Sequence, residues 1–316
     1  MQHTTPGIPA PARVKRAMPR LLREMYRYRY VYALLLPALA IMIIFRYVPM
    51  YGVQIAFKNF MIGKGIMGSE WVGLKQFQRM FDEPTFLQVL RNTLVISGLG
   101  LVFGFPAPIF LAIILNEIRL KWFKRVTQTI SYLPHFISWV VLAGIIKEIL
   151  SMNGLINKII TFFGGTPALY LVNSNWFVQI LILSGIWQGI GWGSIIYLAA
   201  IAGIDKHLYE AAAIDGASRV KQAWHITLPS IMPVVFLMFL LRIGNLLENN
   251  FDQIFNLYTP LVYSVGDVIQ TYVYRVGLVS LDFSYSAAIG LFQNVIGFIL
   301  LLVVNFSSRK FKEYGV

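Results

Sequence analysis

Residues 176–202 read WFVQILILSGIWQGIGWGSIIYLAAIA, and no residue in this stretch carries a charge. A helix needs roughly 20 mostly apolar residues to cross the hydrocarbon core of a bilayer, because each residue adds only about 1.5 Å of length. Residues 176–202 meet that requirement. We therefore interpret them as a membrane-spanning helix.

Other segments of the chain meet the same requirement. Including the first, the expected spans are Tyr30–Val53, Phe86–Leu115, Val126–Leu150, Trp176–Ala202, Ile231–Leu247 and Ser286–Phe306. The second contains Pro106 and Pro108, which we expect to kink it. The fifth is the shortest, and its far end becomes polar at Glu248. The sequence predicts an all-α membrane protein with six transmembrane helices.

The composition agrees with a membrane location. Hydrophobic residues make up 57% of the chain, charged residues only 13%, and the mean hydropathy is +0.64. A soluble globular protein carries about 25% charged residues. The chain has no Cys, and its four His residues do not stand at metal-ligand spacing, so we expect neither a metal site nor a cofactor.

The Lys and Arg residues indicate the orientation. With a cytoplasmic N-terminus, 17 of the 27 basic residues fall on the cytoplasmic side, 8 on the opposite side and 2 inside helices. Cytoplasmic loops accumulate Lys and Arg, so both termini are predicted to be cytoplasmic. The net charge of +13 then needs no nucleic-acid partner. We expect a basic cytoplasmic tail at 1–29, retained and not cleaved as a signal peptide, followed by one transmembrane domain at 30–316.

The loop between the fourth and fifth spans is the most informative segment. Residues 203–229 read GIDKHLYEAAAIDGASRVKQAWHITLP, and the orientation places them in the cytoplasm. Leu208–Ile214 is predicted to be a short helix that ends at Gly216, because glycine readily adopts the left-handed conformation. A second short helix is expected at Ala217–Ile226. Pro229 would then lie in the first turn of the next span.

This loop resembles the "EAA" coupling loop of bacterial ABC importer permeases. The matching positions are Glu210, Ala211, Ala212, Gly216, Ile226, Leu228 and Pro229, to which we add Asp215 as a further coupling residue. The resemblance implies that the loop inserts into a cleft of an ATP-binding subunit. It also implies that Glu210 is a charged anchor and that Gly216 fixes the turn. The alternative is an ordinary amphipathic connector.

Further segments are similar to the carbohydrate branch of these permeases. They are Tyr32–Pro37, Tyr47–Pro49, Trp71–Phe77 and Ser286–Asn305, and they are most similar to permeases for complex oligosaccharides, of the alginate or lipoprotein-linked sugar type. The chain has no phosphate-binding loop, so ATP and Mg²⁺ are expected on a separate partner chain. The resemblance implies a second homologous permease subunit, two ATP-binding subunits and an external solute-binding protein. This chain would itself be a non-catalytic subunit.

Polar residues inside the spans are candidates for a substrate pathway. Arg242 lies deep in the fifth span, and Asn245 and Asn249 follow on the same helical face. Arg242 is expected either to pair with the carboxylate of an acidic sugar or to form an internal ion pair, with Glu248 or with a partner helix. Weaker candidates are Trp187, Gln188, Trp192, Gln293 and Asn294.

Three other functions were weighed against import. An ion-coupled secondary transporter would need buried carboxylates or histidines at mid-depth, and the spans between Tyr30 and Leu247 hold essentially no such Asp or Glu. A membrane-embedded enzyme would need a cluster of His, Asp or Ser near one interface, which the sequence lacks. Composition alone does not exclude a non-transporting assembly subunit.

Overall fold

The computed structural model describes residues 27–312, with side chains to residue 306. It divides into two units, Met1–Val53 and Gln54–Val316. The first contains α2 (Arg29–Met42), and the apolar helical segment that begins with α2 runs on to Phe57. Most of the basic tail predicted at 1–29 lies outside the described residues.

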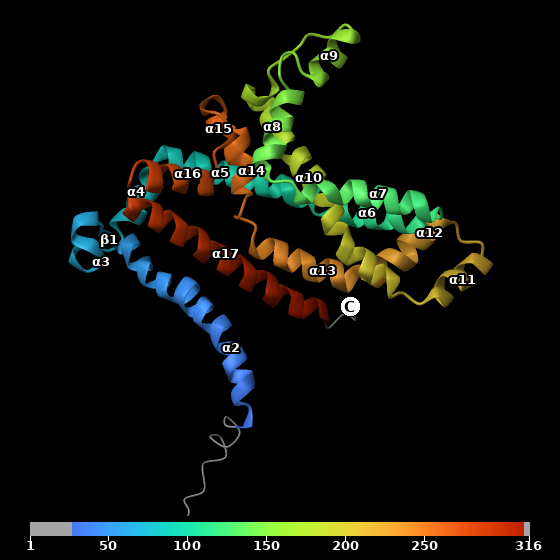
Figure 1. Ribbon diagram of the computed structural model, residues 1–316, viewed down its shortest axis with the longest axis horizontal. Coiled ribbons are helices and arrows are strands. Elements are labelled where there is room, and N and C mark those ends of the chain that lie inside the picture. The colour runs from blue at the N-terminus through green and yellow to red at the C-terminus, as the bar shows by residue number, and fades with distance from the viewer. Residues whose placement is uncertain (1–26, 313–316) are drawn as a thin grey trace, which may run out of the picture. The chain divides into compact units, whose positions relative to one another are not determined.

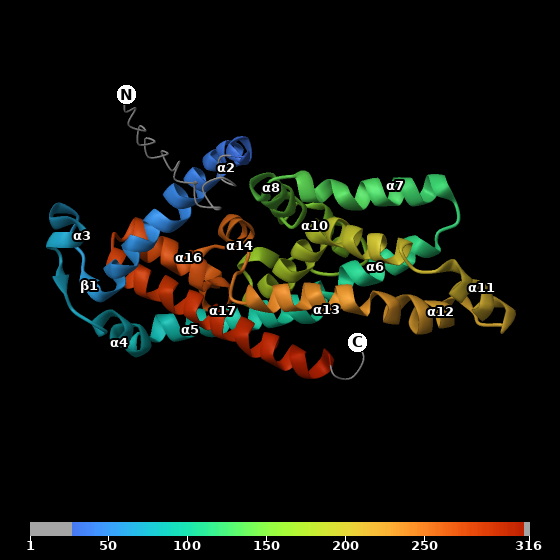
Figure 2. The same ribbon diagram turned by 90° about the horizontal axis from the view of Figure 1, so that it is seen from below.

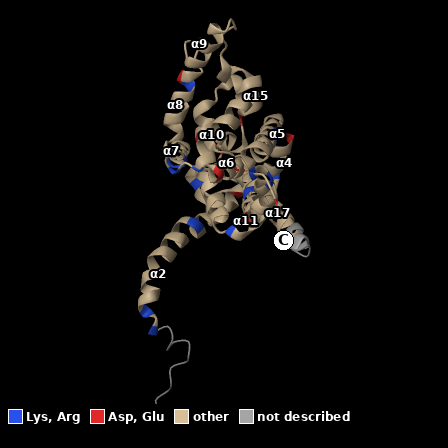
Figure 3. Cartoon of the chain, turned by 90° about the vertical axis from the view of Figure 1, so that its right-hand side faces the viewer, with Lys and Arg blue, Asp and Glu red and all other residues tan. Residues whose placement is uncertain are grey.

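The second unit is built from long helices that run side by side (Figure 1). They are α5 (Pro84–Leu99), α6 (Pro106–Glu117), α7 (Lys121–Tyr132), α10 (Ser174–Ala202), α13 (Leu228–Gly244) and α17 (Phe283–Lys312), while α8 (Trp139–Ile149) projects away from them. The helix α10 packs against α6, α7 and α13, and α13 packs against α17. Long stretches of these helices carry no charged residue (Figure 3), which is what a lipid-facing surface requires.

Shorter elements complete the second unit. They are the antiparallel strands β1 (Lys58–Asn59) and β2 (Glu70–Trp71), and the helices α3 (Gly65–Gly68), α4 (Lys75–Asp82), α9 (Leu155–Phe162), α11 (Lys206–Ile214), α12 (Arg219–Gln222), α14 (Phe251–Leu257), α15 (Tyr263–Gly266) and α16 (Ile269–Tyr274). In both views, α11 and α12 lie at one end of this unit and α3, α4 and α16 at the opposite end (Figure 2).

The third predicted span, Val126–Leu150, is not one straight helix. The helix α7 continues into a 3-10 turn at Leu133–Phe136, and α8 then leaves at an angle of 106°. Pro134 lies in that turn, where it has no N–H to donate and its ring disfavours a continued α-helix. Within the described residues, five helical segments are long and apolar enough to span a membrane, or six if this bent pair counts as one.

Pro49, Pro106 and Pro229 each follow a π-helical turn, whereas Pro37 and Pro233 lie inside α2 and α13 without one. The turns Ile43–Tyr47, Gly100–Gly104 and Ala223–Thr227 each end two residues before a proline. A π turn inserts one extra residue, so the proline ring no longer collides with the carbonyl one turn back. The expected irregularity at Pro106 therefore takes the form of a π turn within one continuous helical segment, Pro84–Glu117.

The fifth span also differs from its prediction. A separate helix at Ala217–Ile226 was expected, with the span itself at Ile231–Leu247. In the structure, α12 continues through the π turn into α13, so that one helical segment runs from Arg219 to Gly244. Pro229 lies in the first turn of α13, as predicted, but the π turn before it joins α13 to α12 in one segment. The segment ends at Gly244, three residues before the predicted Leu247.

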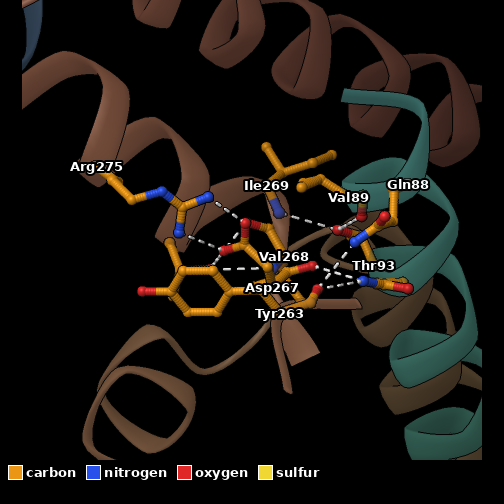
Figure 4. Close-up of polar contacts among 10 residues, drawn as sticks. Gln88, Val89, Thr93, Tyr263, Asp267, Val268, Ile269 and Arg275 are labelled. Carbon is orange, nitrogen blue, oxygen red and sulfur yellow. Dashed lines mark hydrogen bonds and ion pairs between the residues drawn. The ribbon is translucent and has the colours of Figure 1, made fainter. Parts of the chain in front are cut away.

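A polar network holds the connection between α15 and α16 against α5 (Figure 4). The Asn92 side chain donates to the carbonyls of Tyr263 (3.3 Å) and Asp267 (3.1 Å), and the Thr93 hydroxyl accepts from the Ile269 N–H (3.0 Å). The buried Asp267 carboxylate accepts two hydrogen bonds from Arg275. Burial opposes the charge on Arg275, but its bonds to Asp267 outweigh that effect and raise the pKa of the guanidinium.

Candidate functional site

The end of α11 has the geometry that the sequence predicts. The Asp205 carboxylate caps the helix by accepting from the His207 N–H at 3.0 Å. At the other end Gly216 has a φ of +75°, the Ala217 N–H donates to the Ala212 carbonyl (2.9 Å), and the Gly216 N–H donates to the Ala213 carbonyl (3.1 Å). This pair of bonds is the Schellman motif, which favours glycine because of its positive φ.

Two contacts tie the loop to the rest of its unit. The Tyr209 hydroxyl lies 2.9 Å from the Thr227 hydroxyl, which joins α11 to the π turn. Arg219, at the start of α12, forms an ion pair of 3.1 Å with Glu117, the last residue of α6. The α11 segment is therefore held at a defined place although none of its own residues is buried.

The surface of this loop combines charged side chains with exposed apolar ones. Ile214 is 87% exposed, and at least half of the surface of Leu208, Val220 and Trp224 is exposed. The Glu210 side chain is 69% exposed, and its partner is the exposed His207 at 3.3 Å. Such a patch on a defined element is typical of a docking surface. We refer to residues 205–224 as the coupling surface.

The remaining predicted loop residues divide into two groups. Ala211, Asp215, Gly216 and Pro229 are exposed, as a docking role requires, and Ala212 is half-buried. Ile226 and Leu228 are half-buried, and Leu228 packs on the apolar cluster that contains Tyr197 and Ile231. The exposed residues face outward, whereas Leu228 packs the start of α13 against α10.

A cavity of about 500 Å³ lies in the second unit, bounded by α5, α10, α13 and α14. Four of the predicted pathway residues line it: Arg242, Asn245, Asn249 and Gln188. Within the described part of the chain, Arg242 has no hydrogen bond or ion pair, and the alternative ion pair with Glu248 is not formed. A Cβ at Gly100 would lie 3.7 Å from the Arg242 guanidinium, so this cation rests against the π turn of α5.

Asn249 has an incompletely satisfied side chain. Its Oδ1 accepts from the Ser97 hydroxyl at 3.3 Å, whereas its Nδ2 is buried and has no hydrogen-bond partner among the described residues. An unsatisfied buried donor costs free energy of about 1–3 kcal/mol. Its position beside a cavity is expected where a ligand completes the hydrogen bonding.

Other predicted pathway residues lie elsewhere. Trp187 and Trp192 are half exposed and do not line the cavity; the Trp192 ring stacks on His135 at 4.7 Å, next to the break in the third span. Gln293 and Asn294 line a second cavity of about 140 Å³. The Gln293 side chain also donates to the Leu247 carbonyl at 2.8 Å, which gives it a structural role just beyond the end of α13.

Sequence reasoning missed several residues that line the larger cavity. Ser97, Trp139 and Gln253 were not among the candidates, although each lines it. Ser97 lies inside a predicted span, where a single hydroxyl among apolar residues carries little signal. Gln253 follows the fifth span in a segment for which no structure was predicted.

Comparison with known proteins gives consistent results. Residues 104–313 match the family described as binding-protein-dependent transport system inner membrane component. The chain is 45% identical to the polygalacturonan/rhamnogalacturonan transport system permease protein YteP of Bacillus subtilis (strain 168), covering 98% of this chain and 97% of that one. It is 42% identical to protein LplB of the same organism, covering 93% of both.

Solved structures agree with these relatives. The chain superposes with a TM-score of 0.87, at 40% identity, on a chain from the crystal structure of a bacterial ABC transporter involved in the import of the acidic polysaccharide alginate. The match covers 92% of this chain and 99% of that one. A chain from the bacterial alginate ABC transporter in complex with an alginate pentasaccharide-bound periplasmic protein gives the same TM-score at 39% identity, covering 94% and 100%.

Proposed function

We propose, from the premise that this chain belongs to the family of binding-protein-dependent transport system inner membrane components, that it is one permease subunit of an ATP-driven importer of acidic oligosaccharides. The chain is a multi-pass protein of the bacterial inner membrane. It carries out no catalysis itself. It converts the closure of partner ATPase subunits, which bind ATP and Mg²⁺, into movement of its helices.

The coupling surface carries this proposal. It combines the residues of the EAA loop with an exposed and well-anchored helix, α11, whose small Ala side chains allow another protein to approach closely. The distribution of Lys and Arg supports a cytoplasmic position for it, where ATP is available. A second homologous permease, two ATP-binding subunits and an external solute-binding protein complete the assembly that we propose.

Purification in mild detergent tests the proposed assembly. We expect an ATP-binding subunit to co-purify with this chain, and ATP hydrolysis by the complex to rise when the loaded solute-binding protein is added. A chain that purifies without any ATPase subunit under these conditions would contradict the importer function.

The cavity supports an acidic oligosaccharide as substrate. Arg242 lines it as a cation without an anionic partner among residues 27–306, and a carboxylate is the group that a guanidinium binds best, through two parallel hydrogen bonds. The names of the relatives point to the same chemistry, because polygalacturonan and alginate are both polymers of uronic acids. We propose that Arg242 binds a carboxylate of the transported sugar.

Replacing Arg242 by alanine is expected to slow uptake of trigalacturonate about tenfold or more, because a charge-assisted hydrogen bond contributes about 1.5–3 kcal/mol. Uptake of the carboxyl-reduced trisaccharide, which has the same length and no charge, should change little. Initial uptake rates in proteoliposomes provide the measurement. Arg242→Lys is the control that keeps the charge but loses the bidentate geometry. Its uptake rate for trigalacturonate should lie between those of the wild type and Arg242→Ala. Equal losses for both sugars would refute the role of Arg242.

A further inference from the structure

The carboxamide of Gln253 has a fixed orientation. Its Nε2 donates to the Leu181 carbonyl at 2.7 Å and to the Ser184 hydroxyl at 2.9 Å, and the residue is only 7% exposed. A backbone carbonyl has no proton to donate, so the atom that faces Leu181 must be the nitrogen. Ser184 requires the same orientation, since its own hydroxyl donates to the Ile180 carbonyl at 2.6 Å.

The carboxamide oxygen is left available by this arrangement. Gln253 lines the larger cavity, and its Oε1 has no hydrogen-bond partner among the described residues. On the facing helix, α10, the nearby residue is Gly185, and a Cβ there would lie 3.5 Å from Oε1. Because glycine has no side chain, nothing at this position of α10 covers the oxygen.

A complementary donor lies four residues before it. Asn249 lines the same cavity with a buried Nδ2 that has no hydrogen-bond partner among the described residues. Gln253 and Asn249 therefore contribute one free acceptor and one free donor to the cavity. A hydroxyl group both donates and accepts, so it satisfies both amides, whereas a carboxylate satisfies only Asn249.

We propose that Gln253 is a specificity-determining residue, which accepts a hydrogen bond from a hydroxyl of the transported oligosaccharide while Asn249 donates one. This inference rests on the proposed function and extends it: Arg242 recognises the charge of the sugar, and Gln253 recognises a hydroxyl. A site that hydrogen-bonds a hydroxyl strongly rejects the analogue that lacks it, because the buried polar group is then left unpaired.

The test compares trigalacturonate with a series of its monodeoxy derivatives in proteoliposomes that contain the complete complex and saturating solute-binding protein. The wild-type complex is expected to import one of these derivatives about tenfold more slowly than the parent sugar. In Gln253→Met, which keeps the size of the side chain but has no acceptor oxygen, parent and derivative should be imported at similar rates. The binding protein is the same in both complexes, so its own selectivity cancels.

Two further variants separate recognition from packing. Gly185→Ala places a methyl group in ordinary contact with the carboxamide, 3.5 Å from Oε1 and 3.4 Å from Nε2, so it covers the oxygen but also touches the nitrogen. We expect it to lose the preference for the hydroxyl as Gln253→Met does. Ser184→Ala weakens the link between α14 and α10 but leaves Oε1 free, so it should keep the preference. Thermal unfolding of each complex provides the measure of packing.

The outcomes are distinct. If Gln253→Met and Gly185→Ala slow all sugars equally and keep the wild-type preference, Gln253 only links two helices and the inference is wrong. A wild-type complex that imports trigalacturonate with no preference among the derivatives also overturns it. A wild-type complex that imports none of the sugars contradicts the proposed function instead.

Discussion

The variant Gly191→Ala is expected to be poorly recovered as a folded protein and to unfold at a much lower temperature than the wild type. A Cβ at this position would lie 2.0 Å from the carbonyl oxygen of Ser131 and 2.8 Å from the backbone nitrogen of Tyr132. These are backbone atoms of α7, so no side-chain rotation relieves the collision, and α7 and α10 must move apart. Close helix contacts of this kind depend on small residues in membrane proteins.

The expected loss of stability in Gly191→Ala is large because the contacts around residue 191 are lost as well. Overpacking costs about 1–3 kcal/mol where side chains yield, and we expect at least about 3 kcal/mol where the backbone must move. The collision also lies next to the break in the third span, which begins at Leu133. Separation of the two helices there would disturb the direction in which α8 leaves.

Gly189→Ala is the matched control on the same helix. A Cβ at Gly189 would have no neighbour within 4 Å, and alanine is the better helix former by about 1 kcal/mol. We therefore expect it to be neutral or slightly stabilising. Fluorescence-detected size exclusion and thermal unfolding in detergent provide the measurements. If both variants unfold at the wild-type temperature, the contact between α7 and α10 is not as close as described.

These two glycines illustrate what the sequence could and could not predict. Gly185, Gly189, Gly191 and Gly193 lie in one span, and their composition alone indicates helix packing for all of them. The structure divides them: Gly191 lies against α7 and does not line the cavity, whereas Gly185, Gly189 and Gly193 line it, Gly193 also lying against Pro108. The difference depends on which neighbour each face of α10 meets, and hydropathy carries no information about that.

The spans were predictable because bilayer thickness sets a strong requirement on length and apolarity. Their interruptions were less predictable. Pro106 is predicted to bend a helix and Pro229 to begin one, and a π turn precedes each; Pro134, for which no bend is predicted, coincides with a bend of 106°. A proline in the sequence indicates only that one backbone hydrogen bond is missing. The packing around it determines whether the helix bends, bulges or ends.

The candidate site was predictable in part, where a polar residue lies in an otherwise apolar helix. Arg242 and Asn249 stand out because polar residues in an apolar helix are costly. Gln253 does not, because α14 follows the fifth span in a segment that folds back into the unit without crossing the membrane in full. Trp192 was selected for an aromatic ring that instead stacks on His135.

Reversing the charge of Glu210 is expected to abolish import while leaving the chain folded and inserted. The Glu210 side chain is 69% exposed, and its partner is His207 at 3.3 Å on the same helix, so Glu210→Lys removes no contact that stabilises the fold. An exposed pair of this kind contributes little to stability. If α11 docks on the ATPase as we propose, a lysine at its charged anchor opposes that docking directly.

The expected effect on transport is correspondingly large. Losing a charge-assisted contact in a protein interface, and placing a like charge in its stead, costs about 2–5 kcal/mol, which is about thirtyfold or more in affinity. Oligosaccharide uptake in proteoliposomes should fall below detection, and the stimulation of ATP hydrolysis by the solute-binding protein should be lost. The amount of chain in the membrane fraction and its unfolding temperature should match the wild type.

His207→Ala is the control that assigns the effect to the carboxylate. It removes the described partner of Glu210 and keeps the negative charge, and His207 is itself 86% exposed. Because docking in our proposal depends on that charge and not on the pair, this variant should import at nearly the wild-type rate. Normal uptake in Glu210→Lys would count heavily against the proposal that the coupling surface docks on the ATPase. An equal loss of uptake in both variants would instead mean that His207 takes part in docking. The fold of α11 would not explain it, because α11 is held by the contact between Tyr209 and Thr227 and not by this exposed pair.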